Sequence, residues 1–314
     1  MINYGYVDSD FAFWYEDASV NARQPDIHLN FWVGYKNEKA CIDIGIRFYQ
    51  GMRIRQYYIY VPFGVVLSDI EDLFETFKYK EVAEGIFNKN CNISINAPED
   101  NIELSYDGGK EKILPLIKLR ITSTRCGQGS ILCLDLESVK TIISNDNIYF
   151  RWRLPCPILS NIIKKSILHG FSIDSPYIMS NYRYFFKINE IRSLPSDVKD
   201  KINITSKYYN SIVIILVNSN KIDINTSNCY KIRILEEDLF KKYKPKDYMD
   251  PSSNVYQWHV INNSSGSCSF IIEANARRIN WISVLIYFLI ILMTSLLANG
   301  IFECLKNNLK LGCK

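Results

Sequence analysis

Apolar and polar residues alternate along several short stretches of the chain, as they do in β-strands that bury one face. Three such stretches, Leu29–Tyr35, Cys41–Phe48 and Tyr57–Val61, are separated by polar turns and predict three antiparallel strands. The two glycines within Asp107–Lys110 predict a hairpin turn, because glycine tolerates the positive φ of tight turns. The same alternation predicts further strands at Ile117–Thr122, Ile131–Leu136, Ile148–Leu154, Tyr184–Ile188, Ser211–Val217 and Val255–Ile261.

Helical patterns are fewer. Ser68 and Glu71 have the spacing of a capping box, and Ile70, Leu73, Phe74 and Phe77 would then share one helix face. Shorter helices are predicted at Ser160–Leu168 and Leu235–Tyr243. The order of three strands followed by a Leu-Ser-x-Ile helix start occurs twice, after Pro62 and after Pro155. An ancient duplication and chance reuse of common strand and cap chemistry both explain this recurrence.

The last apolar stretch differs from all the others. Residues 279–302 carry no ionisable side chain except Tyr287. At about 1.5 Å per residue, a helix from Trp281 to Phe302 would be roughly 33 Å long, enough to cross a hydrocarbon layer of about 30 Å. A buried core helix is the alternative, but such helices rarely stay apolar around the whole circumference for six turns. Trp281 and Phe302 are therefore predicted to mark the two ends of a membrane anchor.

The sequence thus predicts an α+β fold: a predominantly antiparallel, sandwich-like β-rich soluble region, either one unit or two similar α+β modules, followed by one C-terminal transmembrane helix. The predicted division is residues 1–95 as a first β-rich module with one helix, 96–278 as a second β-rich region, 279–302 as the transmembrane helix and 303–314 as a short polar tail.

The orientation of the anchor is not set by local charge, because Arg277 and Arg278 on one side face three lysines on the other. The first eighteen residues contain four acidic side chains and no continuous apolar run, unlike a signal peptide. We therefore expect a tail-anchored, single-pass protein with its N-terminal region in the cytoplasm. Thr294 and Ala298 form a small-xxx-small pair, which makes a homo-oligomer through the anchor one expected partner.

Composition narrows the class of protein further. The 314 residues are 47% hydrophobic and 22% charged, which is typical of a folded protein, and the net charge of +4 is too small to indicate a nucleic-acid-binding domain. The nine cysteines lack the paired spacing of a disulfide scaffold and fit a reducing compartment. The three histidines stand far apart without a Cys/His cluster, so no metal, cofactor or catalytic residue is predicted.

Basic and aromatic residues form the strongest candidate binding site. On a strand, residues i and i+2 share a face, so Arg53 with Arg55, and Arg151 with Arg153, would each project two guanidinium groups together. Such pairs suit phosphate or carboxylate, and nearby rings such as that of Tyr57 could stack on a base. These five residues are the predicted ligand-binding set. The alternatives are a solvated sheet face with cross-strand ion pairs, or a basic surface facing anionic lipid.

The function that these features favour is a non-enzymatic sensor or effector at the membrane, in which the cytosolic β-rich region binds a nucleotide-like ligand or a protein partner. Membrane-disrupting antiviral defence proteins of prokaryotes share this plan, which is an analogy of architecture only. A membrane tether or adaptor for a protein partner is the alternative. A membrane-surface enzyme with an unfamiliar site is a less favoured third reading.

Overall fold

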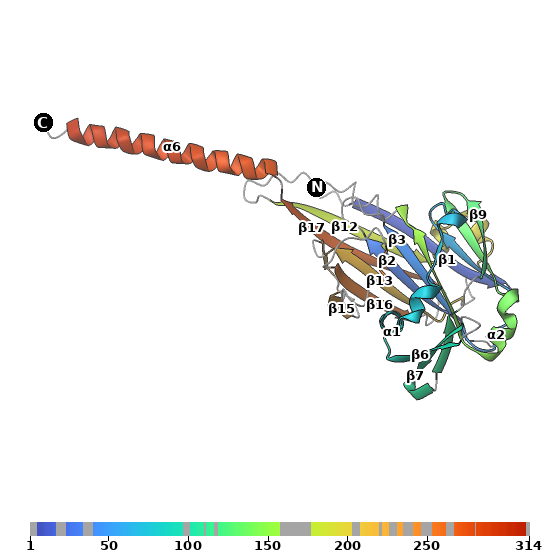
Figure 1. Cartoon of the computed structure of the whole chain (residues 1–314). Helices are drawn as coiled ribbons and strands as arrows, with labels where there is room; N and C mark the ends of the chain where they lie inside the picture. Colours follow the sequence, from blue (N-terminus) through green and yellow to red (C-terminus); the bar gives the residue numbers. More distant parts are fainter. Residues whose placement is uncertain are drawn as a thin grey trace.

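The structure is a computed structural model that describes residues 5–16, 23–33, 40–96, 101–109, 111–115, 119–157, 177–202, 208–219, 222–225, 231–234, 241–245, 253–261, 267–279 and 281–311. Within these ranges the chain forms two β-sheets packed face to face, and one long helix extends away from them (Figure 1). The predicted fold class, β-rich α+β with a C-terminal apolar helix, is confirmed.

The smaller sheet has seven strands among the described residues, and the helix leaves from one of them, β17. Strand β12 pairs with β1 in parallel and with β17 antiparallel, while β4 pairs antiparallel with both β1 and β10. The strands in spatial order are β14 (Ile222–Asn225), β17 (Cys268–Ile279), β12 (Tyr177–Ile188), β1 (Gly5–Glu16), β4 (Gln56–Val61), β10 (Gly129–Asp135) and β9 (Arg120–Cys126).

The larger sheet has ten strands in the described part of the chain. Its centre is β13, β2, β3 and β11, and the short strand β5 (Glu71–Asp72) pairs with β11 beside the main path. The strands of the main path, in spatial order, are β15 (Lys231–Ile234), β16 (Ser253–Ile261), β13 (Ser211–Ser219), β2 (Asp26–Val33), β3 (Cys41–Phe48), β11 (Ile148–Pro155), β8 (Glu111–Pro115), β7 (Asn101–Tyr106) and β6 (Cys91–Asn96).

Strands from the two predicted β-rich ranges, 1–95 and 96–278, lie together in both sheets. β1 pairs with β12, β2 pairs with β13, and β3 pairs with β11. The largest hydrophobic core, which lies between the sheets, accordingly includes residues from Phe11 to Ile272. One core therefore serves both ranges.

A second, smaller core covers the other face of the larger sheet, which we call its outer face. Trp32, Tyr149 and Val217 on that face pack against Phe77 and Ile86 among others. The covering elements are α1 (Lys80–Phe87), the 3-10 helix η2 (Phe74–Lys78) and strands β6 to β8. Because both of its faces are covered, β2 is buried along almost its whole length.

Several predicted elements differ from the structure. The capping-box helix at Ser68 does not form: Leu67–Asp69 is a single 3-10 turn, η1, and the α-helix begins only at Lys80. The reason is local, since Glu71 and Asp72 pair with β11 and the Asp72 carboxylate accepts the Phe74 backbone N–H at 2.8 Å. Strand β4 also departs from the predicted trio, because it joins the smaller sheet instead of pairing with β3.

The predicted hairpin turn is confirmed. The hairpin between β7 and β8 turns through η3 (Asp107–Gly109), where Gly108 has φ 71° and Gly109 has φ 91°. The predicted helix at Ser160–Leu168 and most of that at Leu235–Tyr243 lie outside the described residues. The remaining short helices are η4 (Glu137–Val139), α2 (Lys140–Asn145), η5 (Ile191–Ser193) and α4 (Ser196–Lys199).

The C-terminal helix α6 runs from Trp281 to Leu311, so it begins at the predicted residue and continues nine residues past Phe302. Its segment Val284–Glu303 has a mean hydropathy of 2.3 and is not buried against the rest of the protein. A helix of that length and composition, apolar on every side and uncovered, fits a single membrane span rather than a core helix.

Candidate functional site

The outer face of the larger sheet carries polar side chains where a sheet covered on both faces normally carries apolar ones. On β2, Asp26, His28 and Asn30 alternate with residues of the main core, and neighbouring strands place further polar residues beside them. The pairing registers set out three cross-strand rows: Asp26 beside Arg47 and Tyr149, His28 beside Gly45 and Arg151, and Asn30 beside Asp43 and Arg153.

The row that contains Asp43 is closed over, and we call it the sealed end of the outer face. The Asp43 carboxylate is fully buried and accepts hydrogen bonds from Trp32 Nε1 at 2.8 Å, Tyr243 Oη at 2.6 Å and Arg153 Nε and Nη2 at 2.7 and 3.1 Å. Arg153 Nη2 also donates to the Tyr243 backbone oxygen at 2.7 Å. The carboxylate thus has four donors and no access to solvent.

Arg151 extends this network toward the opposite end. Its side chain is fully buried, with Nε donating to Tyr243 Oη at 2.6 Å and Nη1 donating to Tyr149 Oη at 2.7 Å. Its Nη2 lies 3.9 Å from Asp43 Oδ2 and has no hydrogen-bond partner among the described residues. Two buried guanidinium groups therefore share one buried carboxylate, and half-exposed Glu71, 3.6 Å from Arg153 Nη1, is a weaker second counter-charge.

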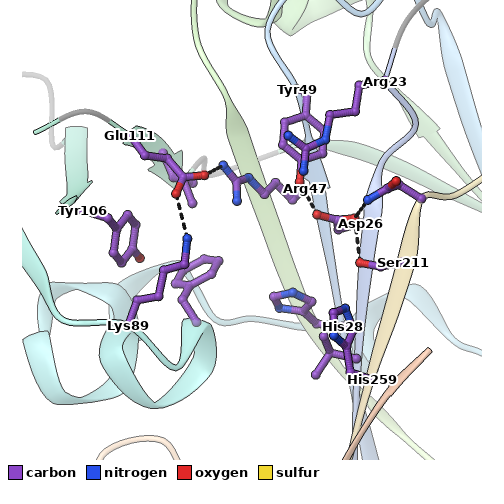
Figure 2. A pocket seen from close by; sticks show the side chains of 14 residues that line it. Arg23, Asp26, His28, Arg47, Tyr49, Lys89, Tyr106, Glu111, Ser211 and His259 are labelled. Atoms are coloured by element: carbon purple, nitrogen blue, oxygen red, sulfur yellow. Dashed lines mark hydrogen bonds and ion pairs between the residues drawn. The ribbon is translucent and has the colours of Figure 1, made fainter. Parts of the chain in front are cut away.

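The row that contains Arg47 opens into a pocket of about 340 Å³, which we call the open end. Figure 2 shows Arg47 reaching toward Glu111, with Lys89 and Tyr106 beside Glu111 on the left of the view and Asp26 and Ser211 on the right. The full lining is Arg23, Asp26, His28, Arg47, Tyr49, Phe87, Lys89, Tyr106, Glu111, Ile113, Asn210, Ser211, Val213 and His259. A volume of this size is at the lower end of those that hold small organic ligands.

The two carboxylates of the pocket are held ionised. Burial alone would raise the pKa of Asp26, but hydrogen bonds from Tyr49, Asn210 and Ser211 bring that pKa below its usual value. Burial likewise opposes ionisation of Glu111, yet hydrogen bonds from Arg47 and Lys89 lower its pKa. Three lining cations, those of Arg23, Arg47 and Lys89, face these two anions, so the lining carries an excess of one positive charge.

The rings of the pocket hold the cations in place. The guanidinium carbon of Arg23 lies 3.7 Å from the centroid of the Tyr49 ring, and that of Arg47 lies 4.7 Å from the same centroid. Among the described residues, the ion pairs recorded at this pocket are those of Glu111 with Arg47 and with Lys89.

Two polar atoms of the pocket are buried and lack a hydrogen-bond partner among the described residues: Tyr106 Oη and Arg47 Nε. Tyr106 is 1% exposed, and Figure 2 shows its hydroxyl directed toward the interior of the pocket. A buried donor without an acceptor costs about 1–3 kcal/mol. Such atoms beside a cavity indicate a missing acceptor.

The network also defines the state of His28. Because Tyr149 Oη accepts from Arg151, its own proton is free to donate to His28 Nδ1, 3.1 Å away. We therefore assign the imidazole proton to Nε2, so that the ring offers a donor on its other side. Burial, and then the positive charge of Arg151, lower the pKa of His28 to about 3. The imidazole is therefore neutral at physiological pH.

The five predicted ligand-binding residues lie in two different places. Arg151 and Arg153 do share a face, as predicted, but Arg153 belongs to the sealed end and Arg151 to the row beside it. Arg53 and Arg55 are exposed in the segment before β4, and Ile54 between them is buried. Tyr57 is fully buried, and its hydroxyl donates to the Tyr208 backbone oxygen at 3.2 Å. The structure therefore does not bring the two arginine pairs together.

Arg55 has an acidic rather than an aromatic setting. It lines an open depression of about 470 Å³ together with Glu16, Gln56, Asp135 and Glu137. Three carboxylates around one guanidinium group do not favour an anionic ligand there. Among the described residues no cluster of His, Cys, Asp and Glu has the arrangement of a metal site.

Sequence reasoning missed most of the pocket. Asp26, Lys89, Tyr106 and Glu111 were not singled out, and the histidines, His28 among them, were considered only as metal ligands. One signal was present: Asp26, His28 and Asn30 alternate with Ile27, Leu29 and Phe31. Comparison of the sequence with protein-family models and with curated proteins finds no match.

Proposed function

We propose that this protein is a membrane-anchored sensor or effector, whose β-rich region binds a small ligand at the open end of the outer face and whose helix α6 carries the response to the bilayer. The observation that carries the proposal is the junction between sheet and helix. Strand β17 ends at Ile279 and α6 begins at Trp281, with one residue between them. A junction this short leaves little slack between the two.

The contacts of β17 support this coupling. All twelve of its residues pair with β12, and β12 pairs with β1. The chain leads from β1 to β2, whose Asp26 and His28 line the pocket. A ligand that shifts β2 would therefore act on strands continuous with the anchor.

Binding is favoured over catalysis by the state of the pocket's ionisable groups. A histidine with a pKa of about 3 is too weak a base for proton transfer near neutral pH. Asp26 and Glu111 are already engaged by several donors each, so neither is poised as a general acid. Such a set positions a ligand more readily than it moves protons.

A cytoplasmic location of the β-rich region is part of the proposal. Six cysteines of the described residues are not joined in disulfides, and burial raises the pKa of one of them, Cys41. Cysteines left outside disulfides are expected in a reducing compartment. Exposed Asn92 begins an Asn-Ile-Ser sequon, so expression in eukaryotic cells gives a direct test. We expect no glycan at Asn92, and a glycosidase-sensitive mass increase would reverse the orientation.

The experiment that tests the sensor or effector role compares the full chain with a truncation after Ile279. An earlier cut, near Asn275, would also remove the end of β17 that pairs with Tyr177–Ser180 of β12. We expect growth arrest or dye release from vesicles with the full chain only. Phe288→Lys with Leu292→Lys is the matched control, since it abolishes insertion while leaving the sheets intact. A full chain that is harmless under every trigger would overturn the role.

The alternative function is a tether for a protein partner, and the edge of the larger sheet is the observation that favours it. Strand β6 lies at that edge in the described structure and exposes 51% of Ile95. Exposed edge strands can accept a strand from another chain. A single stoichiometric partner that is captured by the full chain and lost with Ile95→Lys would favour the tether. An empty eluate would exclude it.

A further inference from the structure

Glu111 joins two cations of the pocket lining. It begins β8 next to the hairpin turn and reaches into the pocket, where it accepts hydrogen bonds from Arg47 of β3 and from Lys89, the latter at 2.9 Å (Figure 2). The three residues come from three separate segments, since Lys89 lies between α1 and β6. One carboxylate thus holds two cations that belong to opposite walls of the pocket.

This carboxylate does not satisfy the donors around it. Arg47 Nε and Tyr106 Oη remain buried without an acceptor among the described residues, although both belong to the same lining. His28 contributes a further donor at Nε2, through the tautomer set by Tyr149. Glu111 accepts from Arg47 Nη2 through Oε1 and from Lys89 through Oε2, but neither oxygen reaches Arg47 Nε or Tyr106 Oη. The pocket therefore has donors that Glu111 does not meet.

A phosphoryl group matches this excess better than a second carboxylate would. It offers three oxygens arranged in space, so donors that approach from different walls can each find an acceptor. Its charge of about −1.5 to −2 near neutral pH also suits a lining with three cations. The ring walls formed by Tyr49, Phe87 and Tyr106 leave room for an apolar or aromatic remainder.

We infer that the open end is a binding site for a small phosphate monoester, and that Glu111 occupies the place of its phosphoryl group when the site is empty. On binding, the phosphoryl oxygens replace the Glu111 carboxylate at Arg47 and Lys89 and accept from Tyr106. Glu111 is then a built-in competitor. This inference rests on the proposed ligand-binding function and names the class of ligand.

The test is calorimetric titration of the full chain in detergent, in phosphate-free buffer of constant ionic strength, with phenyl phosphate and with benzoate. These probes share a ring and differ in the anionic group. We expect phenyl phosphate to bind and benzoate to bind at least about tenfold more weakly, because the carboxylate leaves donors unmet. Equal affinity for the two probes would overturn the assignment of phosphate.

Glu111→Gln removes the competing charge, so phenyl phosphate should bind on the order of tenfold more tightly to this variant. The matched control is Glu103→Gln on the same hairpin, which deletes a carboxylate that pairs with Lys112 at 2.8 Å outside the pocket. It changes the net charge equally and should leave the affinity unchanged. Equal tightening in both variants, or none in Glu111→Gln, would overturn the role of Glu111.

Tyr106→Phe separates binding from folding. The hydroxyl has no partner among the described residues, so its removal should leave the thermal midpoint unchanged or slightly higher. The affinity for phenyl phosphate should fall about three- to tenfold, the equivalent of one hydrogen bond. Unchanged affinity with unchanged stability would exclude Tyr106 from the site and the inference with it.

The inference and the proposed function fail differently. If phenyl phosphate binds while the full chain never affects growth or vesicles, the pocket stands and the effector role falls. If the full chain arrests growth while no probe binds wild type or Glu111→Gln, the role stands and the phosphate site falls.

Discussion

The sealed and open ends of the outer face are built from the same three strands, β2, β3 and β11, and from the same kinds of side chain. They differ in what covers them. At the sealed end, Tyr243 closes over Asp43, and the carboxylate has four donors. At the open end, Arg47 and Tyr106 border a cavity, and each retains a donor without an acceptor among the described residues. Burial of charge thus serves the fold at the sealed end, whereas at the open end the donors without an acceptor border a cavity.

The largest expected effect is on the sealed end, through Asp43→Asn. The substitution removes the main counter-charge of buried Arg151 and Arg153. Breaking a buried ion pair from one side typically costs about 3–5 kcal/mol, because the remaining charge stays buried. We expect a loss of that size in the free energy of unfolding, measured by urea titration of the full chain in detergent.

Glu103→Gln is the control for Asp43→Asn, since the Glu103–Lys112 pair lies near the surface and its loss should cost no more than about 1 kcal/mol. If Asp43→Asn were equally mild, the arginines would not depend on this carboxylate. The comparison of the two ends would then lose its basis.

The next effect concerns Gly45, which lies in the row between the two ends. A Cβ atom there would be 2.0 Å from Tyr149 Oη and 2.9 Å from Arg151 Nη1, so Gly45→Ala forces both buried groups to move. Overpacking of this kind costs about 1–3 kcal/mol. Because Tyr149 orients His28, we also expect weaker binding of phenyl phosphate, measured on the folded fraction.

Gly64→Ala is the matched control. Its Cβ would lie 2.1 Å from Arg125 Nη1, an equally short distance, but Arg125 is exposed and can swing away. The expected change in unfolding free energy is within about 0.5 kcal/mol. Similar losses in both variants would show that close approach alone, rather than the network, sets the cost at Gly45.

The same contrast explains what the sequence could predict. Alternation identified β3 and β11 with almost correct bounds, and the i, i+2 rule placed Arg151 and Arg153 on one face. Alternation cannot say whether that face meets water or another layer. Here β5, α1 and Tyr243 cover it, and the counter-charge comes from Asp43, more than one hundred residues away. The pairing of distant strands therefore decides whether the two arginines are buried or exposed.

The elements that were missed have physical reasons. Strand β1 was not predicted because Asp8, Asp10 and Glu16 interrupt its apolar pattern, yet it lies between β12 and β4. The capping box at Ser68 was overridden by the pairing of Glu71 with β11. The membrane helix was predicted well because its signal is local: composition and length suffice, and no distant partner is required.

The smallest expected effect belongs to the exposed pair ahead of β4, through Arg53→Glu with Arg55→Glu. Both side chains face solvent, so the free energy of unfolding should change by no more than about 0.5 kcal/mol. This pair was predicted to bind a ligand or anionic lipid, and cosedimentation with vesicles that contain phosphatidylserine tests that role. This test is made on a chain whose anchor is disabled by Phe288→Lys with Leu292→Lys. If the arginine pair contacts lipid, reversing its charge should abolish the cosedimentation that this chain retains. Unchanged cosedimentation would leave Arg53 and Arg55 as solvated surface charges.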